Sequence, residues 1–92
     1  MSAMKLLVVD DSNIVRSRIA RVVQSGALGD VTLIGLARNG NDALRAARHA
    51  APDVVTMDLT MPEMDGLACI PELLAMHPTT RILVISALDD KT

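Results

Sequence analysis

The sequence contains no Phe, Tyr or Trp and a single cysteine, Cys69. A hydrophobic core must therefore be built from aliphatic side chains and methionine, although half of the residues are hydrophobic. One cysteine excludes an internal disulfide and is typical of a protein in the reducing cytoplasm. A basic excess is also absent, because the net charge is -2, and this argues against a nucleic-acid-binding surface.

Long hydrophobic runs are missing too. No run approaches the ~18 apolar residues of a membrane span, and the N-terminus lacks the pattern of a signal peptide. We expect no membrane association, a cytoplasmic location and one domain over residues 1–92.

Short apolar runs alternate with segments of helical periodicity along the chain. The predicted strands cover residues 5–9, 31–37, 54–57 and 81–85. The first predicted helix follows Ser12 and ends at Gly26 or Gly29. The second covers residues 42–50, and the third covers about 66–76. Such alternation with short connections predicts an α/β fold, a three-layer doubly wound parallel sheet with helices on both faces.

The first predicted helix has an apolar stripe at helical spacing, formed by Ile14, Val15, Ile19, Val22 and Val23. The opposite row is basic and is interpreted as a solvated face, formed by Arg16, Arg18 and Arg21.

The third predicted helix contains Pro71. A proline in a helix interior destabilises the helix by about 3 kcal/mol. Either the helix restarts near Pro71 or it is kinked there. Cys69 is expected to be a buried, inert thiol of this helix, and His49 and His77 are expected at the surface.

Acidic side chains follow two of the predicted strands. Asp10 and Asp11 come after the first, Asp58 comes after the third, and Ser86 follows the fourth. Because ligands bind at the carboxyl ends of parallel strands, the three carboxylates should converge if the first and third strands are neighbours. Two like charges 4 Å apart repel by about 4 kcal/mol at an effective dielectric of 20, so such a cluster must take up a proton or a cation. A hard divalent cation with oxygen ligands fits such a cluster, and we expect Mg²⁺.

Simpler interpretations remain open for each of these residues. The pair Asp10–Asp11 could cap the following helix, Asp58 could be a turn residue, and Ser86 could be structural. Two further pairs are expected to serve turn and cap chemistry rather than catalysis, namely Met61–Pro62 and Asp65–Gly66.

Three motifs together resemble the receiver domain of two-component response regulators. They are Leu-Val-Val-Asp-Asp-Ser at 7–12, Asp-Leu-Thr-Met-Pro-Glu-Met-Asp-Gly at 58–66 and Val-Ile-Ser-Ala at 84–87. The nine-residue block is the most specific of the three. The resemblance implies a flavodoxin-like fold with strand order 2-1-3-4, which lacks the fifth strand and the last two helices of the family.

The resemblance also implies a role for each matching residue. Asp58 would accept a phosphoryl group from the phosphohistidine of a histidine kinase or phosphotransfer protein. Asp11 and Asp58 would bind Mg²⁺ directly, together with the backbone carbonyl of Thr60, and Asp10 would act mainly through water. The chain would catalyse its own phosphorylation and dephosphorylation without being a turnover enzyme.

Beyond the fourth strand, Ser86 and the Ala87 backbone N–H would donate hydrogen bonds to the phosphoryl group. The family's lysine and aromatic switch residue on a fifth strand are not matched, because the sequence ends at Thr92 and Lys91 follows the fourth strand too closely. Phosphorylation with magnesium alone, without a full conformational switch, is therefore expected.

The missing strand would leave the fourth strand as an apolar edge, and we expect a homodimer through it. An alternative function is a truncated receiver that is not phosphorylated and acts as a dimerisation or kinase-competing module. A phosphatase with an aspartate nucleophile is disfavoured, because the second acid of such enzymes is replaced by Thr60.

Overall fold

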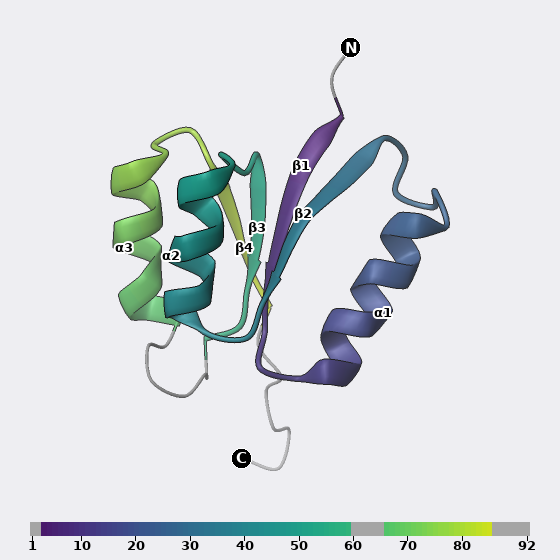
Figure 1. The fold of residues 1–92 in the computed structure, drawn as a ribbon, viewed down its shortest axis with the longest axis horizontal. Helices are drawn as coiled ribbons and strands as arrows, with labels where there is room; N and C mark the ends of the chain where they lie inside the picture. Colours follow the sequence, from purple (N-terminus) through teal and green to yellow (C-terminus); the bar gives the residue numbers. More distant parts are fainter. Residues whose placement is uncertain (1–2, 60–65, 86–92) are drawn as a thin grey trace.

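The computed structural model describes residues 3–59 and 66–85. These residues form four strands and three helices in strict alternation (Figure 1). The elements are β1 (Met4–Val9), α1 (Asn13–Gln24), β2 (Val31–Ala37), α2 (Gly40–His49), β3 (Val54–Met57), α3 (Gly66–Met76) and β4 (Arg81–Val84). The predicted order is confirmed, and α2 begins two residues earlier than expected because Asn39 caps it by accepting the N–H of Asp42 at 2.9 Å.

The four strands form one parallel sheet in the order β2-β1-β3-β4, which confirms the predicted strand order. Helices α2 and α3 lie on one side of the sheet and α1 lies on the other (Figure 1). The fold is therefore the three-layer, flavodoxin-like arrangement. The central strands are buried on both faces, as the unbroken apolar run of β1 predicts.

Each face of the sheet has its own hydrophobic core. The larger core lies under α2 and α3 and contains Leu7, Val9, Ala37, Ala43, Leu44, Ala47, Val55, Met57, Cys69 and Leu73. The smaller core lies under α1 and contains Leu6, Val8 and Val23, with partly buried neighbours such as Ile19. Aliphatic side chains fill both cores, with Met57 and Cys69 added in the larger one, as the absence of aromatic residues requires.

Helix α1 is rotated relative to the expected orientation. Ile14 is 65% exposed and Val22 is 42% exposed, so neither belongs to an inner stripe. Arg16, which was predicted on the solvated face, is only 8% exposed. Among the described elements, α1 alone covers this face, and it contacts the sheet through a narrow stripe that includes Ile19 and Val23. Arg16 lies on the same side, near the end of β1.

Helix α3 runs through Pro71 as one helix, and Pro71 itself is exposed. Cys69 is fully buried as predicted, and burial raises the pKa of its thiol to about 11. The prediction for His77 is wrong. Its ring is half-buried, and its Nε2 lies 2.7 Å from the carbonyl oxygen of Ala47, which links the end of α3 to α2.

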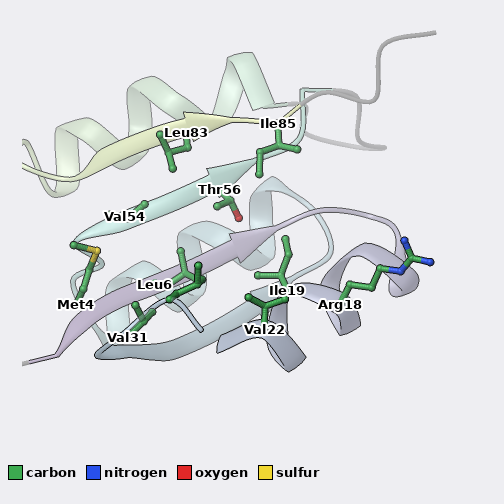
Figure 2. A pocket seen from close by; sticks show the side chains of 11 residues that line it. Met4, Leu6, Arg18, Ile19, Val22, Val31, Val54, Thr56, Leu83 and Ile85 are labelled. Carbon is green, nitrogen blue, oxygen red and sulfur yellow. The ribbon is translucent and has the colours of Figure 1, made fainter. Parts of the chain in front are cut away.

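An apolar groove of about 480 Å³ lies beside α1 on its face of the sheet. Figure 2 shows Ile19 and Val22 of α1 on one side of this groove, and Leu83 and Ile85 from the β4 segment on the other. The hydroxyl of Thr56 on β3 also faces the groove, and it is buried without a hydrogen-bond partner among the described residues. Within residues 3–59 and 66–85, no helix has the length and apolar character needed to cross a membrane.

Candidate metal and phosphoacceptor site

Three carboxylates meet where β1 and β3 end. The two strands are parallel neighbours with Val9 paired to Met57, so the residues that follow them come to the same edge of the sheet. This edge is the lower one in Figure 1. One carboxylate oxygen from each of Asp10, Asp11 and Asp58 lies within 4.8 Å of the others. The predicted convergence of these acids is therefore confirmed in the structure.

Backbone hydrogen bonds hold the two acidic segments in place. The N–H of Asp10 donates to the carbonyl of Ala37 at 2.9 Å, and the N–H of Asp58 donates to the carbonyl of Val9 at 3.0 Å. Each bond continues the ladder of the sheet by one residue beyond the strand. The rigid sheet thus determines where both backbones lie.

The cluster is partly buried. Asp10 and Asp58 are each 8% exposed, whereas Asp11 is exposed. Burial raises the pKa of the Asp10 carboxyl, and the charges of Asp58 and Asp11 raise it further. A 2.8 Å hydrogen bond from the Ser12 N–H and the positive charge of Arg16 oppose the rise. Negative charge at Asp10 is therefore costly in the absence of a cation.

The chemistry of the donors fits a magnesium ion. Carboxylate oxygens are hard ligands, and Mg²⁺ takes one or two of them while it keeps several waters. Two buried acids and one exposed acid, Asp11, provide both a low-dielectric anchor and a side that is open to solvent.

The helix-capping interpretation of the acidic pair is wrong. The N-cap of α1 is Ser12, whose side-chain oxygen accepts the N–H of Val15 at 3.3 Å. Asp10 instead accepts the N–H of Ser12, and this leaves its carboxylate facing the cluster.

Arg16 is a contributor that the sequence pattern did not reveal. Its Nη1 donates to the carbonyl oxygen of Asp10 at 2.5 Å, and its Nη2 donates to Oδ1 of Asn13. A signal was present in the sequence, because position 16 precedes the partly buried Ile19 by three residues and the buried Val23 by seven. The positive charge of Arg16 favours an exposed position, whereas its spacing favours a buried one.

Gly66 is a second residue with a role that only packing explains. A Cβ at this position would lie 2.6 Å from the carbonyl oxygen of Asp58 and 2.9 Å from Cγ of Met57. The start of α3 can approach the Asp58 backbone this closely only because residue 66 has no side chain. The structure thus gives a physical reason for the glycine that ends the nine-residue motif.

The remaining predicted site residues lie outside the described residues. They are Thr60, Ser86 and Ala87, together with Lys91, Met61–Pro62 and Asp65. Their roles stay predictions.

Comparison with known proteins agrees with this geometry. The family model described as "Response regulator receiver domain" matches residues 6–92. A protein-glutamate methylesterase/protein-glutamine glutaminase of Carboxydothermus hydrogenoformans is 41% identical over 91 residues, which are 99% of this chain and 25% of that protein. A chemotaxis protein CheY of Listeria monocytogenes is 36% identical over 85 residues, which are 92% of this chain and 69% of that protein. The chain thus spans about a quarter of the methylesterase relative.

Solved structures show the same fold. The response regulator domain of Thermotoga maritima CheB has a TM-score of 0.80 at 32% identity, over 94% of this chain and 62% of that one. A CheY of Borrelia burgdorferi, in a complex described as CheX-CheY-BeF3-Mg+2, has a TM-score of 0.82 at 28% identity, over 98% of this chain and 67% of that one. With the acidic cluster at the expected strand ends, these matches lead to one conclusion: the chain belongs to the response regulator receiver domain family.

Proposed function

We propose that Asp58 accepts a phosphoryl group from the phosphohistidine of a histidine kinase or phosphotransfer protein, with Mg²⁺ bound at the acidic cluster. One observation carries the proposal, namely that oxygens of Asp58, Asp10 and Asp11 lie within 4.8 Å of one another. The same cluster favours this function over a receiver that serves only as a non-phosphorylated module, because a module of that kind has no need for converging carboxylates.

The proposed step is a displacement at phosphorus. A carboxylate oxygen of Asp58 forms the new P–O bond while the P–N bond to the donor imidazole breaks. The electron pair of that bond leaves with the nitrogen, which is protonated from solvent. When bound, magnesium supplies charge neutralisation for the phosphoryl oxygens and the carboxylates.

This chain's own residues position the reacting groups. The sheet holds the Asp58 backbone through its bond to Val9, and burial at 8% exposure excludes most water from the acceptor. Asp11 and the Thr60 carbonyl would serve as further magnesium ligands, with Asp10 acting mainly through water. Positioning and electrostatic stabilisation supply most of the catalysis in phosphoryl transfer.

The family pattern predicts two further contacts to the phosphoryl group. The hydroxyl of Ser86 and the backbone N–H of Ala87 would donate to phosphoryl oxygens after Asp58 is modified. A water molecule would later attack the phosphorus and release phosphate, so that each domain catalyses its own dephosphorylation. We propose no esterase activity for this receiver, although some relatives carry that name.

The related Borrelia complex supports the proposed magnesium and phosphoryl site, since it contains a CheY together with beryllofluoride and magnesium. Beryllofluoride stands in for a phosphoryl group on a carboxylate. The equivalent chemistry in this chain would place magnesium and the phosphoryl group at Asp58.

The test is phosphorylation by a small donor such as acetyl phosphate. With Mg²⁺ present, intact-mass analysis should show one added phosphoryl group, and chelation of the metal should abolish the addition. The variant Asp58→Asn should remain unmodified under the same conditions. An unmodified wild-type protein, or equal modification of the variant, would contradict the proposal.

A second proposal concerns self-association and rests on β4. Leu83 and Val84 are 56% and 51% exposed, and no strand within the described residues pairs with the outer edge of β4. Antiparallel pairing of two β4 edges about an axis between residues 82 and 83 would bring Arg81 opposite the partner subunit's Val84, so that no like charges meet. We therefore propose a homodimer through β4. We also propose a cytoplasmic location, because the free thiol of Cys69 suits a reducing compartment.

Sedimentation at micromolar concentration tests the dimer. The wild-type protein should sediment as a dimer, and Leu83→Lys should shift it towards monomer, because an edge lysine opposes strand pairing. A wild-type monomer at these concentrations would contradict the proposal.

A further inference from the structure

Arg16 is a buried cation next to the acidic cluster, yet its two described hydrogen bonds go to uncharged oxygens. Its side chain is 8% exposed, whereas Arg18 and Arg21 on the same helix are exposed. The guanidinium donates to the backbone carbonyl of Asp10 at 2.5 Å and to the side-chain amide oxygen of Asn13. Burying an arginine is costly, and these contacts offset that cost only while the guanidinium stays in this position.

The contacts of Arg16 complete a network around the turn that joins β1 to α1. The backbone N–H of Arg16 donates to the carbonyl of Ser12 at 3.0 Å, and the N–H of Ser12 donates to the carboxylate of Asp10 at 2.8 Å. The side chain of Arg16 then returns to the Asp10 carbonyl. The backbone of Asp10 is thus held from α1 as well as from the sheet.

The side chain of Arg16 contacts only the backbone of Asp10, so it leaves the carboxylate oxygens of Asp10 and Asp11 to the cation site. Since Arg16 binds the carbonyl of Asp10, the carboxylates of Asp10 and Asp11 stay directed towards Asp58. We propose that Arg16 is a positioning residue for the divalent-cation site, because it fixes the turn that presents Asp10 and Asp11. The inference rests on the proposed function, since it assigns a supporting residue to the same site.

Two physical roles for Arg16 predict opposite results. If Arg16 acted only through its charge, its removal would strengthen Mg²⁺ binding, because a positive charge near the site repels the ion. If Arg16 positions the acids, its removal should weaken binding even though a repulsive charge is lost. Loss of an orienting residue in the outer shell of a metal site typically costs about 10- to 100-fold in affinity.

The experiment measures Mg²⁺ affinity by NMR titration of the wild-type protein and of Arg16→Met, Arg16→Lys, Asn13→Ala and Arg18→Met. Arg16→Met should weaken binding by about tenfold or more. Arg16→Lys should lie between Arg16→Met and wild type, because a lysine keeps one donor but not the planar fork. Asn13→Ala should shift affinity in the same direction, and Arg18→Met, the exposed control on the same helix, should bind like the wild type.

Urea unfolding with and without Mg²⁺ separates positioning from a general contribution to stability. A purely structural role for Arg16 would lower the free energy of unfolding equally under both conditions and leave the magnesium-induced gain unchanged. The positioning role reduces that gain. Should Arg16→Met not fold, Arg16→Lys and Asn13→Ala provide the same comparison.

The outcomes also separate this inference from the proposed function. Wild-type protein that neither binds Mg²⁺ nor becomes phosphorylated would overturn both. Wild-type protein that does both, with unchanged or tighter binding in Arg16→Met and unchanged binding in Asn13→Ala, would overturn only the role of Arg16.

Discussion

A side-chain carbon on Gly66 would lie 2.6 Å from the carbonyl oxygen of Asp58, so the start of α3 is packed directly against the backbone of the proposed phosphoacceptor. The N–H of Gly66 also donates to the carbonyl of Leu59 at 3.3 Å. The glycine therefore connects the position of α3 to the geometry at residue 58. This contact joins the end of β3 to a helix that begins nine residues later.

Gly66→Ala should consequently destabilise the protein by roughly 1–3 kcal/mol, because two of the three neighbouring atoms, the Asp58 carbonyl oxygen and Cα of Leu59, are backbone atoms that cannot rotate away. It should also slow phosphorylation by acetyl phosphate, since relief of the clash displaces Asp58. Urea unfolding and intact-mass time courses measure the two effects. Leu67→Ala, a change at an exposed neighbour, should stay within about 0.5 kcal/mol of the wild type. A Gly66→Ala variant as stable and as active as wild type would contradict the close approach.

Magnesium should stabilise the folded protein, because the three acids converge only in the folded state. At roughly 100 times its dissociation constant, the ion should add about 2.7 kcal/mol to the free energy of unfolding. Thermal or urea unfolding with magnesium, and then with a chelator, measures the gain. Asp11→Asn should lose most of it, whereas Asp30→Asn, a change at an exposed residue before β2 and so at the opposite end of the sheet, should retain it.

Asp10 should make stability depend on pH in the metal-free protein. Because burial and the neighbouring charges raise the pKa of Asp10, the folded state holds its proton more tightly than the unfolded state does. The free energy of unfolding should therefore fall as pH rises from the ordinary carboxyl pKa through the raised value, and the deficit persists at neutral pH.

Asp10→Asn should remove this deficit, since the amide oxygen can still accept the N–H of Ser12. In the absence of metal, the variant should require a higher urea concentration to unfold at pH 7 than the wild type. The difference should shrink at low pH, where the wild-type carboxyl is protonated. A variant that is less stable than the wild type at neutral pH would argue against a destabilising charge at this position.

Cys69 should be unreactive in the folded protein. Its pKa is raised from the ordinary 9.0 to about 11, so the thiolate fraction near pH 8 falls by about 100-fold, and burial blocks access as well. A thiol reagent should modify the protein only in denaturant. A Cys69→Ala, Thr79→Cys double variant places a thiol in an exposed turn, and it should react readily without denaturant. Rapid labelling of native Cys69 would show that α3 opens more easily than its packing suggests.

Local sequence was sufficient to predict the elements and their order. The apolar run of β1, the turn and cap residues and the short connections all predict a parallel α/β sheet, and the structure confirms its strand order. The acidic cluster was predictable for the same reason, because the carboxyl ends of neighbouring parallel strands share one edge. The roles of Thr60, Ser86 and Ala87 remain predictions, since these residues lie outside the described part of the chain.

By itself, the sequence determined the succession of strands and helices and the two acidic segments, because both follow from patterns that act over a few residues. The strand order was predicted only through the resemblance to the receiver family. Tertiary structure alone decided that Arg16 is buried, that Ile14 is exposed, that His77 contacts Ala47 and that α3 requires a glycine at residue 66. Helical periodicity defines an inner face only to within about one residue. The final rotation of each helix depends on which distant backbone atoms its side chains contact after packing.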